Sequence, residues 1–170
     1  MINRIFRFIS SIAFMALVFI CGCSSAKDSA KFAAKAAQGG TAEVEMGRLA
    51  AQRGADPAVK EFGQRMITDH TRANAELKTI AGRKNIQLPS ELGSEQKSEM
   101  DKLSKLSGAE FDKEYMSAMV KDHEEDVKDF ETQAKEGTDP DIKAFAAITL
   151  PTLQNHLRMS RDTAKNVGAK

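Results

Sequence analysis

The sequence has few of the residues that build several common kinds of site. Of 170 residues only two are cysteine, one is tyrosine and none is tryptophan. Cys21 and Cys23 both stand at the end of the N-terminal apolar segment, so the body of the chain has no cysteine for a disulfide, a thiolate metal site or a nucleophile. Basic and acidic residues nearly balance, 25 against 24, which gives no electrostatic basis for binding nucleic acid. No serine stands in a nucleophile elbow and no glycine-rich phosphate loop occurs, so we expect binding or scaffolding rather than catalysis.

The N-terminal segment has the layout of an export signal. Two arginines precede an apolar run over 8–20, which is too short to span a membrane comfortably. The run ends at Ile20-Cys21-Gly22-Cys23, which resembles the bacterial lipobox, in which the last cysteine receives lipid and becomes the new N-terminus. We therefore expect a lipoprotein signal peptide at 1–22 and a tether at 23–29 that is anchored through acyl chains on Cys23. An uncleaved signal anchor and a simple cleaved signal are the alternatives.

The residue after the expected lipidation site indicates the destination. Ser24 replaces the aspartate that holds lipoproteins at the inner membrane of enterobacteria. We therefore expect an outer-membrane lipoprotein whose body faces the periplasm. The membrane is the one partner that the sequence indicates, and a protein partner is left open.

Helix punctuation divides the rest of the chain. Gly54-Ala55-Asp56-Pro57 and Gly137-Thr138-Asp139-Pro140 each join a helix end to a helix start, with aspartate as the N-cap and proline in the first turn. No segment alternates with the period of a strand. The connection over 86–107 is long enough to run back along the molecule, which predicts an all-α, ferritin-like four-helix bundle of two hairpins joined by a long crossover with a short helix. The expected helices are at about 30–53 with a break near Gly39-Gly40, 57–85, 94–106 (the short one), 109–136 and 140–166.

A five-residue phrase occurs twice, as Met66-Ile67-Thr68-Asp69-His70 and as Met119-Val120-Lys121-Asp122-His123. The neighbours match as well, since Glu61-Phe62 precedes the first copy at the same distance as Glu114-Tyr115 precedes the second. Each copy places a histidine one helical turn after a methionine, on the same face. The repeat predicts two related helices that present polar groups to one another inside the bundle.

Four polar residues interrupt the apolar stripes near the midpoints of the four long helices. Because midpoints of antiparallel neighbours lie at similar heights, we expect these residues to meet in one layer. Buried imidazoles and carboxylates are costly unless they bind each other, water or a metal. The four residues are Glu43, His70, His123 and His156.

This layer predicts a site for one or two metal ions, with Asp69 and Asp122 as further ligands or as groups that orient the imidazoles. Imidazole with carboxylate suits zinc, iron or manganese, whereas methionine sulfur favours copper. Met66 and Met119 are the candidate soft ligands, and Met46 and Met159 lie close enough to join them. Two alternatives stay open: the methionines fill the core, and the histidines form a structural hydrogen-bond network with Asp69 and Asp122.

Several motifs resemble a family of exported, ferritin-like bacterial proteins known as domain of unknown function 4142, over about 30–166. The resemblance implies a helical bundle in the cell envelope and no established activity. True di-iron ferritins use Glu-x-x-His, whereas each histidine here has an aliphatic residue three positions earlier, which speaks against ferroxidase chemistry. The motifs are Gly-Arg-Leu-Ala at 47–50, Met-x-x-Asp-His at 66–70, Gly-x-x-Phe-Asp-x-x-Tyr at 108–115, Asp-His at 122–123 and Leu-Pro-x-Leu-x-x-His at 150–156.

Two functions therefore compete at this point. The first is a lipid-anchored envelope protein that binds a transition metal (copper, iron, zinc or manganese) in its mid-bundle layer. The second is a non-catalytic stress or interaction scaffold, in which the buried histidines and aspartates only hold the helices together.

Overall fold

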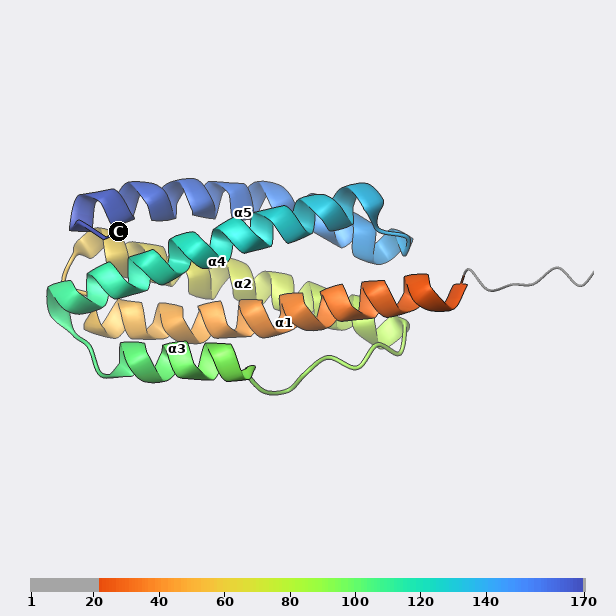
Figure 1. Cartoon of the computed structure of the whole chain (residues 1–170), viewed down its shortest axis with the longest axis horizontal. Helices are drawn as coiled ribbons and strands as arrows, with labels where there is room; N and C mark the ends of the chain where they lie inside the picture. The colour runs from red at the N-terminus through yellow and green to blue at the C-terminus, as the bar shows by residue number, and fades with distance from the viewer. Residues whose placement is uncertain (1–21, 170) are drawn as a thin grey trace, which may run out of the picture.

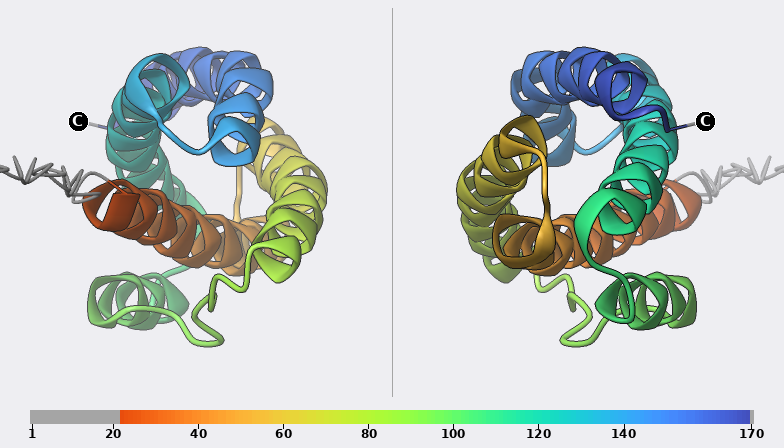
Figure 2. Two further views of the ribbon diagram at one scale, coloured as in Figure 1. Left: turned by 90° about the vertical axis from the view of Figure 1, so that its right-hand side faces the viewer. Right: turned by 90° about the vertical axis from the view of Figure 1, so that its left-hand side faces the viewer.

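The computed structural model describes residues 22–169, with side chains from Ala26 onwards. This part of the chain is all-α (Figure 1). Four long helices form a bundle, and the short helix α3 lies outside it, against α1 and α4 (Figure 2). No described helix combines the length and the apolar character needed to cross a membrane. The helices are α1 (Gly22–Arg53), α2 (Pro57–Arg83), α3 (Ser94–Ser104), α4 (Gly108–Glu136) and α5 (Pro140–Val167).

The expected hairpins are confirmed, α1 with α2 and α4 with α5. Their second helices start where the sequence predicts, because the Asp56 carboxylate accepts a hydrogen bond from the backbone N–H of Ala58, and Asp139 accepts from Asp141 and Ile142. These bonds satisfy N–H groups that the first helical turn leaves without partners. The crossover from α2 to α4 runs back along the bundle, as ferritin-like connectivity requires (Figure 1).

Helix α1 differs from the prediction in two respects. It continues through Gly39-Gly40 without a break, and it includes the residues 23–29 that were expected to form a tether. Gly40 stays helical because it lies where α1 meets α2, and a Cβ there would be 2.4 Å from Asn74 Oδ1. Packing between helices outweighs the roughly 1 kcal/mol that a glycine costs inside a helix. Ser29 is already buried, so packing extends into the expected tether.

The signal peptide and the lipid on Cys23 stay predictions. Residues 1–21 lie outside the described part of the chain, and so does the side chain of Cys23.

Close packing between α1 and α2 sets the geometry of the bundle near its middle. A Cβ on Gly63 would lie 2.7 Å from the Cβ of Ala50, and one on Gly47 would lie 2.6 Å from the carbonyl oxygen of Gly63. Only glycine allows the backbones to approach this closely. The Gly-Arg-Leu-Ala motif at 47–50 is therefore a packing motif. It brings α1 and α2 together about one helical turn from Glu43 and two turns from His70.

The core consists of two apolar clusters. One fills the end of the bundle near the α1–α2 turn and includes Phe62, Met66, Tyr115 and Met119. The other fills the opposite end, from Ala33 and Ile80 to Phe130 and Phe145. The buried polar residues of the middle lie between the two clusters.

Candidate metal centre

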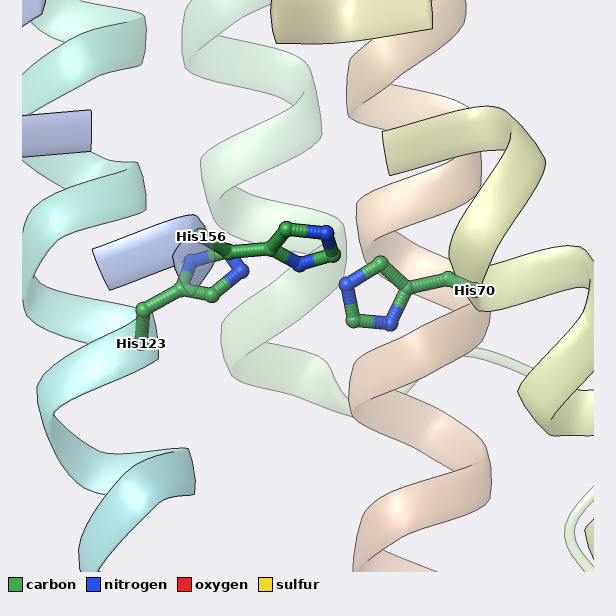
Figure 3. A group of neighbouring side chains, drawn as sticks. All are labelled: His70, His123 and His156. Carbon is green, nitrogen blue, oxygen red and sulfur yellow. The ribbon is translucent and has the colours of Figure 1, made fainter. Parts of the chain in front are cut away.

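One polar side chain from each long helix points into the middle of the bundle. Glu43 comes from α1, His70 from α2, His123 from α4 and His156 from α5, and none of the four is more than 5% exposed. One nitrogen from each histidine lies within 4.8 Å of the other two (Figure 3). The structure thus brings together the four residues that were predicted to share one layer.

The carboxylate of Glu43 lies between two of the imidazoles. Its Oε2 is 2.9 Å from Nδ1 of His70, and its Oε1 is 3.3 Å from Nε2 of His123. Neither approach is aligned as a hydrogen bond, so both oxygens have no hydrogen-bond partner among the described residues. Buried polar atoms without partners are rare in proteins and costly.

Each imidazole also has one nitrogen without a hydrogen-bond partner in the described chain. These atoms are Nε2 of His70, Nε2 of His123 and Nδ1 of His156. Together with the two oxygens of Glu43 they form a set of buried nitrogen and oxygen donors from four helices. Imidazole nitrogen and carboxylate oxygen are ligands of zinc, iron and manganese.

The opposite nitrogens of two histidines are held by hydrogen bonds that fix their tautomers. His123 Nδ1 lies 2.8 Å from the carbonyl oxygen of Met119, which can only accept, so Nδ1 carries the proton. His156 Nε2 donates to Oδ2 of Asp69 at 2.9 Å. Each bond leaves the other ring nitrogen with its lone pair directed elsewhere. Metal-binding histidines are oriented by outer hydrogen bonds of this kind.

Asp69 acts across the bundle, from α2 to α5. Its Oδ2 also accepts a hydrogen bond from Arg65 Nε at 2.6 Å. Burial raises the pKa of Asp69, but the hydrogen bonds from His156 and Arg65 outweigh this and hold the pKa below its ordinary value. Asp69 is therefore ionised at neutral pH, and it positions His156 rather than its neighbour His70.

Burial keeps the imidazoles neutral. It lowers the pKa of His70, His123 and His156 from 6.5 to about 4. The same burial raises the pKa of Glu43 from 4.5 to about 7, with a smaller opposing effect from His123. Neutral imidazole is the form that binds a metal. A cation next to Glu43 would favour the ionised form of the Glu43 carboxyl group.

The second aspartate of the repeat has different surroundings. Asp122 is half-buried and contacts none of the histidines; it lines a cleft between α1, α3 and α4. Burial, followed by the charge of Glu43, raises its pKa to about 7. The two aspartates of the repeat therefore have different surroundings, because α2 and α4 have different neighbours, and a role for Asp122 as a ligand or orienting group stays a prediction.

Asp126, which is not among the candidate ligands named from the sequence, belongs to the surroundings of the site. It lines the same cleft and a small cavity that Glu43 and His70 also line. Burial and the charge of Glu43 raise its pKa well above the ordinary value. The signal was present in the spacing, since Asp126 lies one turn after His123 on the same face of the helix.

The methionines lie in or beside the apolar core. Met66 and Met119 are fully buried in the cluster near the α1–α2 turn, together with Met46. Met159 is half-buried, and its sulfur accepts a hydrogen bond from Asn155. These positions suit core filling, and a role for Met66 and Met119 as soft ligands stays a prediction.

The Gly-x-x-Phe-Asp-x-x-Tyr motif at 108–115 has a structural role. The buried carboxylate of Asp112 accepts hydrogen bonds from the backbone N–H groups of Ala55 and Asp56 and so ties the α1–α2 turn to α4. Tyr115 stacks on Phe111, with ring centroids 5.6 Å apart.

The fold and the polar layer define a ferritin-like helical bundle with a buried group of imidazole and carboxylate side chains. Residues 23–163 match the family model described as "Domain of unknown function (DUF4142)", and the chain belongs to this family. No curated protein matches it.

Two solved structures have the same fold. One is described as a candidate secreted DUF305 protein from Streptomyces coelicolor; it has a TM-score of 0.71 and 18% identity and covers 86% of this chain and 96% of its own. The other is a DUF305 fragment from Deinococcus radiodurans, with a TM-score of 0.71 and 12% identity, covering 81% of this chain and 95% of its own. At these identities the likeness concerns the fold alone.

Proposed function

We propose that this chain is an exported cell-envelope protein, anchored by lipid on Cys23, that holds one transition-metal ion between His70, His123, His156 and Glu43. The observation that carries the proposal is the convergence of three buried imidazoles, with one nitrogen of each within 4.8 Å of one nitrogen of the other two. Each ring also has one nitrogen without a hydrogen-bond partner in the described chain, and so do both oxygens of the neighbouring Glu43 carboxylate. A metal ion between the three imidazoles would bind nitrogens that otherwise lack partners, and Glu43 lies next to two of the rings, close enough to complete the ligand set after a small shift of its side chain.

The donor set favours zinc, iron or manganese. Three nitrogens and one carboxylate supply the four ligands of a tetrahedral ion. Bonds of about 2 Å place tetrahedral donors about 3.3 Å apart, so binding draws the rings of His70, His123 and His156 slightly closer than their present separation. Because the protein fills all four positions, the site suits holding or delivering a metal better than hydrolysis, which needs an open position.

Export and lipidation have separate support. The basic start, the apolar run over 8–20 and the sequence before Cys23 are those of a bacterial lipoprotein signal. The similar structure from Streptomyces coelicolor is also described as a candidate secreted protein. We place the bundle on the periplasmic side of the outer membrane.

Metal content tests the proposal. The processed protein, purified without chelators or a polyhistidine tag and dialysed against zinc, iron(II), manganese or copper, should retain about one ion per chain. Glu43→Gln and His70→Ala should lose it. Glu45→Gln is the matched control, because Glu45 is two residues away on the partly exposed side of α1 and pairs with Arg48. Equal metal content in Glu43→Gln, His70→Ala and the control would refute the site.

The hydrogen bond between Asp69 and His156 favours a second candidate, a scaffold whose polar layer only joins the helices. It is the one such bond between a histidine and an aspartate in the described chain. A well-folded protein that retains no metal after these challenges supports the scaffold.

A further inference from the structure

A cleft of about 380 Å³ opens between α1, α3 and α4 and reaches the buried layer. Glu43 forms part of its lining, together with Asp122 and Asp126 from α4 and Glu99 from α3. One wall is the crossover helix, which lies along the outside of the bundle (Figure 2). A second hollow, of about 240 Å³, reaches the same layer between α2 and α5, where His70 and His156 line it.

The two openings differ in charge. Seven carboxyl groups and three lysines line the cleft, and each lysine already forms an ion pair. This leaves Glu99, Asp122, Glu125 and Asp126 without an ion pair among the described residues, while Glu43 lies beside the imidazoles of His70 and His123, which are neutral. In the other hollow, Asp69 forms ion pairs with Arg65 and Arg72. Crowded carboxyl groups like those of the cleft, whose pKa values are raised at Glu43, Asp122 and Asp126, bind a cation in exchange for their protons. The lysine pairs are Lys35 with Asp129, Lys102 with Glu114 and Lys121 with Glu95.

An independent observation indicates a ligand in the cleft. Glu43 is 2% exposed, lines the cleft, and has no hydrogen-bond partner for either oxygen in the described chain. Oε1 of Glu99, on the facing helix α3, is likewise buried without a partner. Carboxylate side chains from three different helices therefore line one recess, and two of them, Glu43 and Glu99, have buried oxygens without a hydrogen-bond partner in the described chain. At about 30 Å³ per water, a cation with six waters needs about 200 Å³, which the cleft accommodates.

We propose that the cleft between α1, α3 and α4 binds a hydrated divalent cation through Asp122 and Asp126, and that the cation passes from there along Glu43 to the histidines. The second part of this proposal rests on the metal site proposed above. Carboxylates suit a cation that keeps part of its water shell, whereas the imidazoles suit the dehydrated ion. Glu43 belongs to both places, with one face toward the cleft and its oxygens beside His70 and His123.

The first experiment tests binding in the cleft. Mn²⁺ binding is measured by electron paramagnetic resonance on the processed chain. One equivalent of Zn²⁺ is added first to fill the histidine site; it is left out if the protein has been found to retain no zinc. The double variant Asp122→Asn/Asp126→Asn should lose a bound Mn²⁺ that the wild type and the control Glu124→Gln/Glu131→Gln retain. The control makes the same carboxylate-to-amide change twice on the exposed face of α4. Equal Mn²⁺ binding in all three proteins would overturn the cleft site.

The second experiment tests passage. Co²⁺ develops visible absorption bands when imidazole nitrogens bind it, so stopped-flow absorption measures how fast Co²⁺ reaches the histidines. The double variant should take up Co²⁺ about tenfold more slowly and with a weaker dependence on ionic strength, and still reach the same final occupancy. Equal uptake rates in the double variant and the wild type would refute the passage through the cleft and would leave the proposed histidine site intact. A wild-type protein without Co²⁺ bands would refute the histidine site and the passage, and the Mn²⁺ measurement would still decide the cleft.

Discussion

Replacing Glu43 by glutamine should change the pH dependence of stability by about 3 kcal/mol. Burial raises the pKa of Glu43 from 4.5 to about 7, and one pKa unit corresponds to about 1.4 kcal/mol. Between these two values the folded protein binds more protons at this position than the unfolded chain does. Its contribution to stability is therefore present below pH 4.5 and is lost as the pH rises to about 7. Glutamine has the same shape and cannot ionise, so the variant escapes this loss.

The assay is urea unfolding of the metal-free protein, followed by circular dichroism at several pH values between 4.5 and 8. The quantity to compare is the difference in unfolding free energy between Glu43→Gln and wild type. This difference should move in favour of the variant by about 3 kcal/mol across the range. The three imidazoles have the opposite pH dependence, because burial lowers their pKa, but they are present in both proteins. Parallel pH profiles for variant and wild type would refute the reasoning.

Three further predictions concern metal linkage and packing. Zinc at about a hundred times its Kd should raise the unfolding free energy of the wild type by about 2.7 kcal/mol, measured by thermal unfolding. The same zinc concentration should leave the stability of His70→Ala unchanged. Gly63→Ala should lower the free energy of unfolding in urea by about 1–3 kcal/mol, because the new Cβ would lie 2.7 Å from the Cβ of Ala50. Gly82→Ala should raise the free energy of unfolding by about 0.5–1 kcal/mol, because a Cβ at position 82 has no neighbouring atom within 4 Å. Asp112→Ala should cost about 1–3 kcal/mol, measured in the same way, because two backbone N–H groups lose their acceptor.

The sequence was sufficient for the features that depend on local rules. Aspartate followed by proline marks a helix start because both act within one turn, and the helices that follow Asp56 and Asp139 begin where expected. The polar layer was also predictable. It follows from helix midpoints and apolar stripes, and it needs no knowledge of which helices are neighbours.

Features that depend on distant partners were not predictable in this way. Gly40 reads as a helix break until the position of Asn74 is known. The spacing of Asp126 from His123 places both on one face of their helix, but it does not reveal that Asp126 shares a small cavity with Glu43 of α1. The hydrogen bond from His156 to Asp69 joins positions 87 residues apart, and its geometry follows only from the packing of α5 against α2.

The repeated phrase is symmetric in sequence and asymmetric in its surroundings. Met66 and Met119 are both fully buried, and so are Phe62 and Tyr115, so the apolar parts of the two copies have equivalent roles. The aspartates have different roles, because α3 packs on the side of α4 near Asp122, whereas in the described part of the chain no short helix packs in the same way on the side of α2 near Asp69. Asp69 is neutralised by arginines and fixes one imidazole, whereas Asp122 faces an acidic recess.

In the function that we propose, a duplicated motif supplies both part of a ligand set and a route to it. The copy whose aspartate is fixed by its neighbours orients one imidazole, that of His156. The copy whose aspartate has no ion pair among the described residues would take a cation from solvent. The crossover helix α3 makes the difference, because it turns one face of an otherwise symmetric bundle into a cleft. The long crossover of the ferritin-like connectivity therefore contributes to the proposed function as well as to the fold.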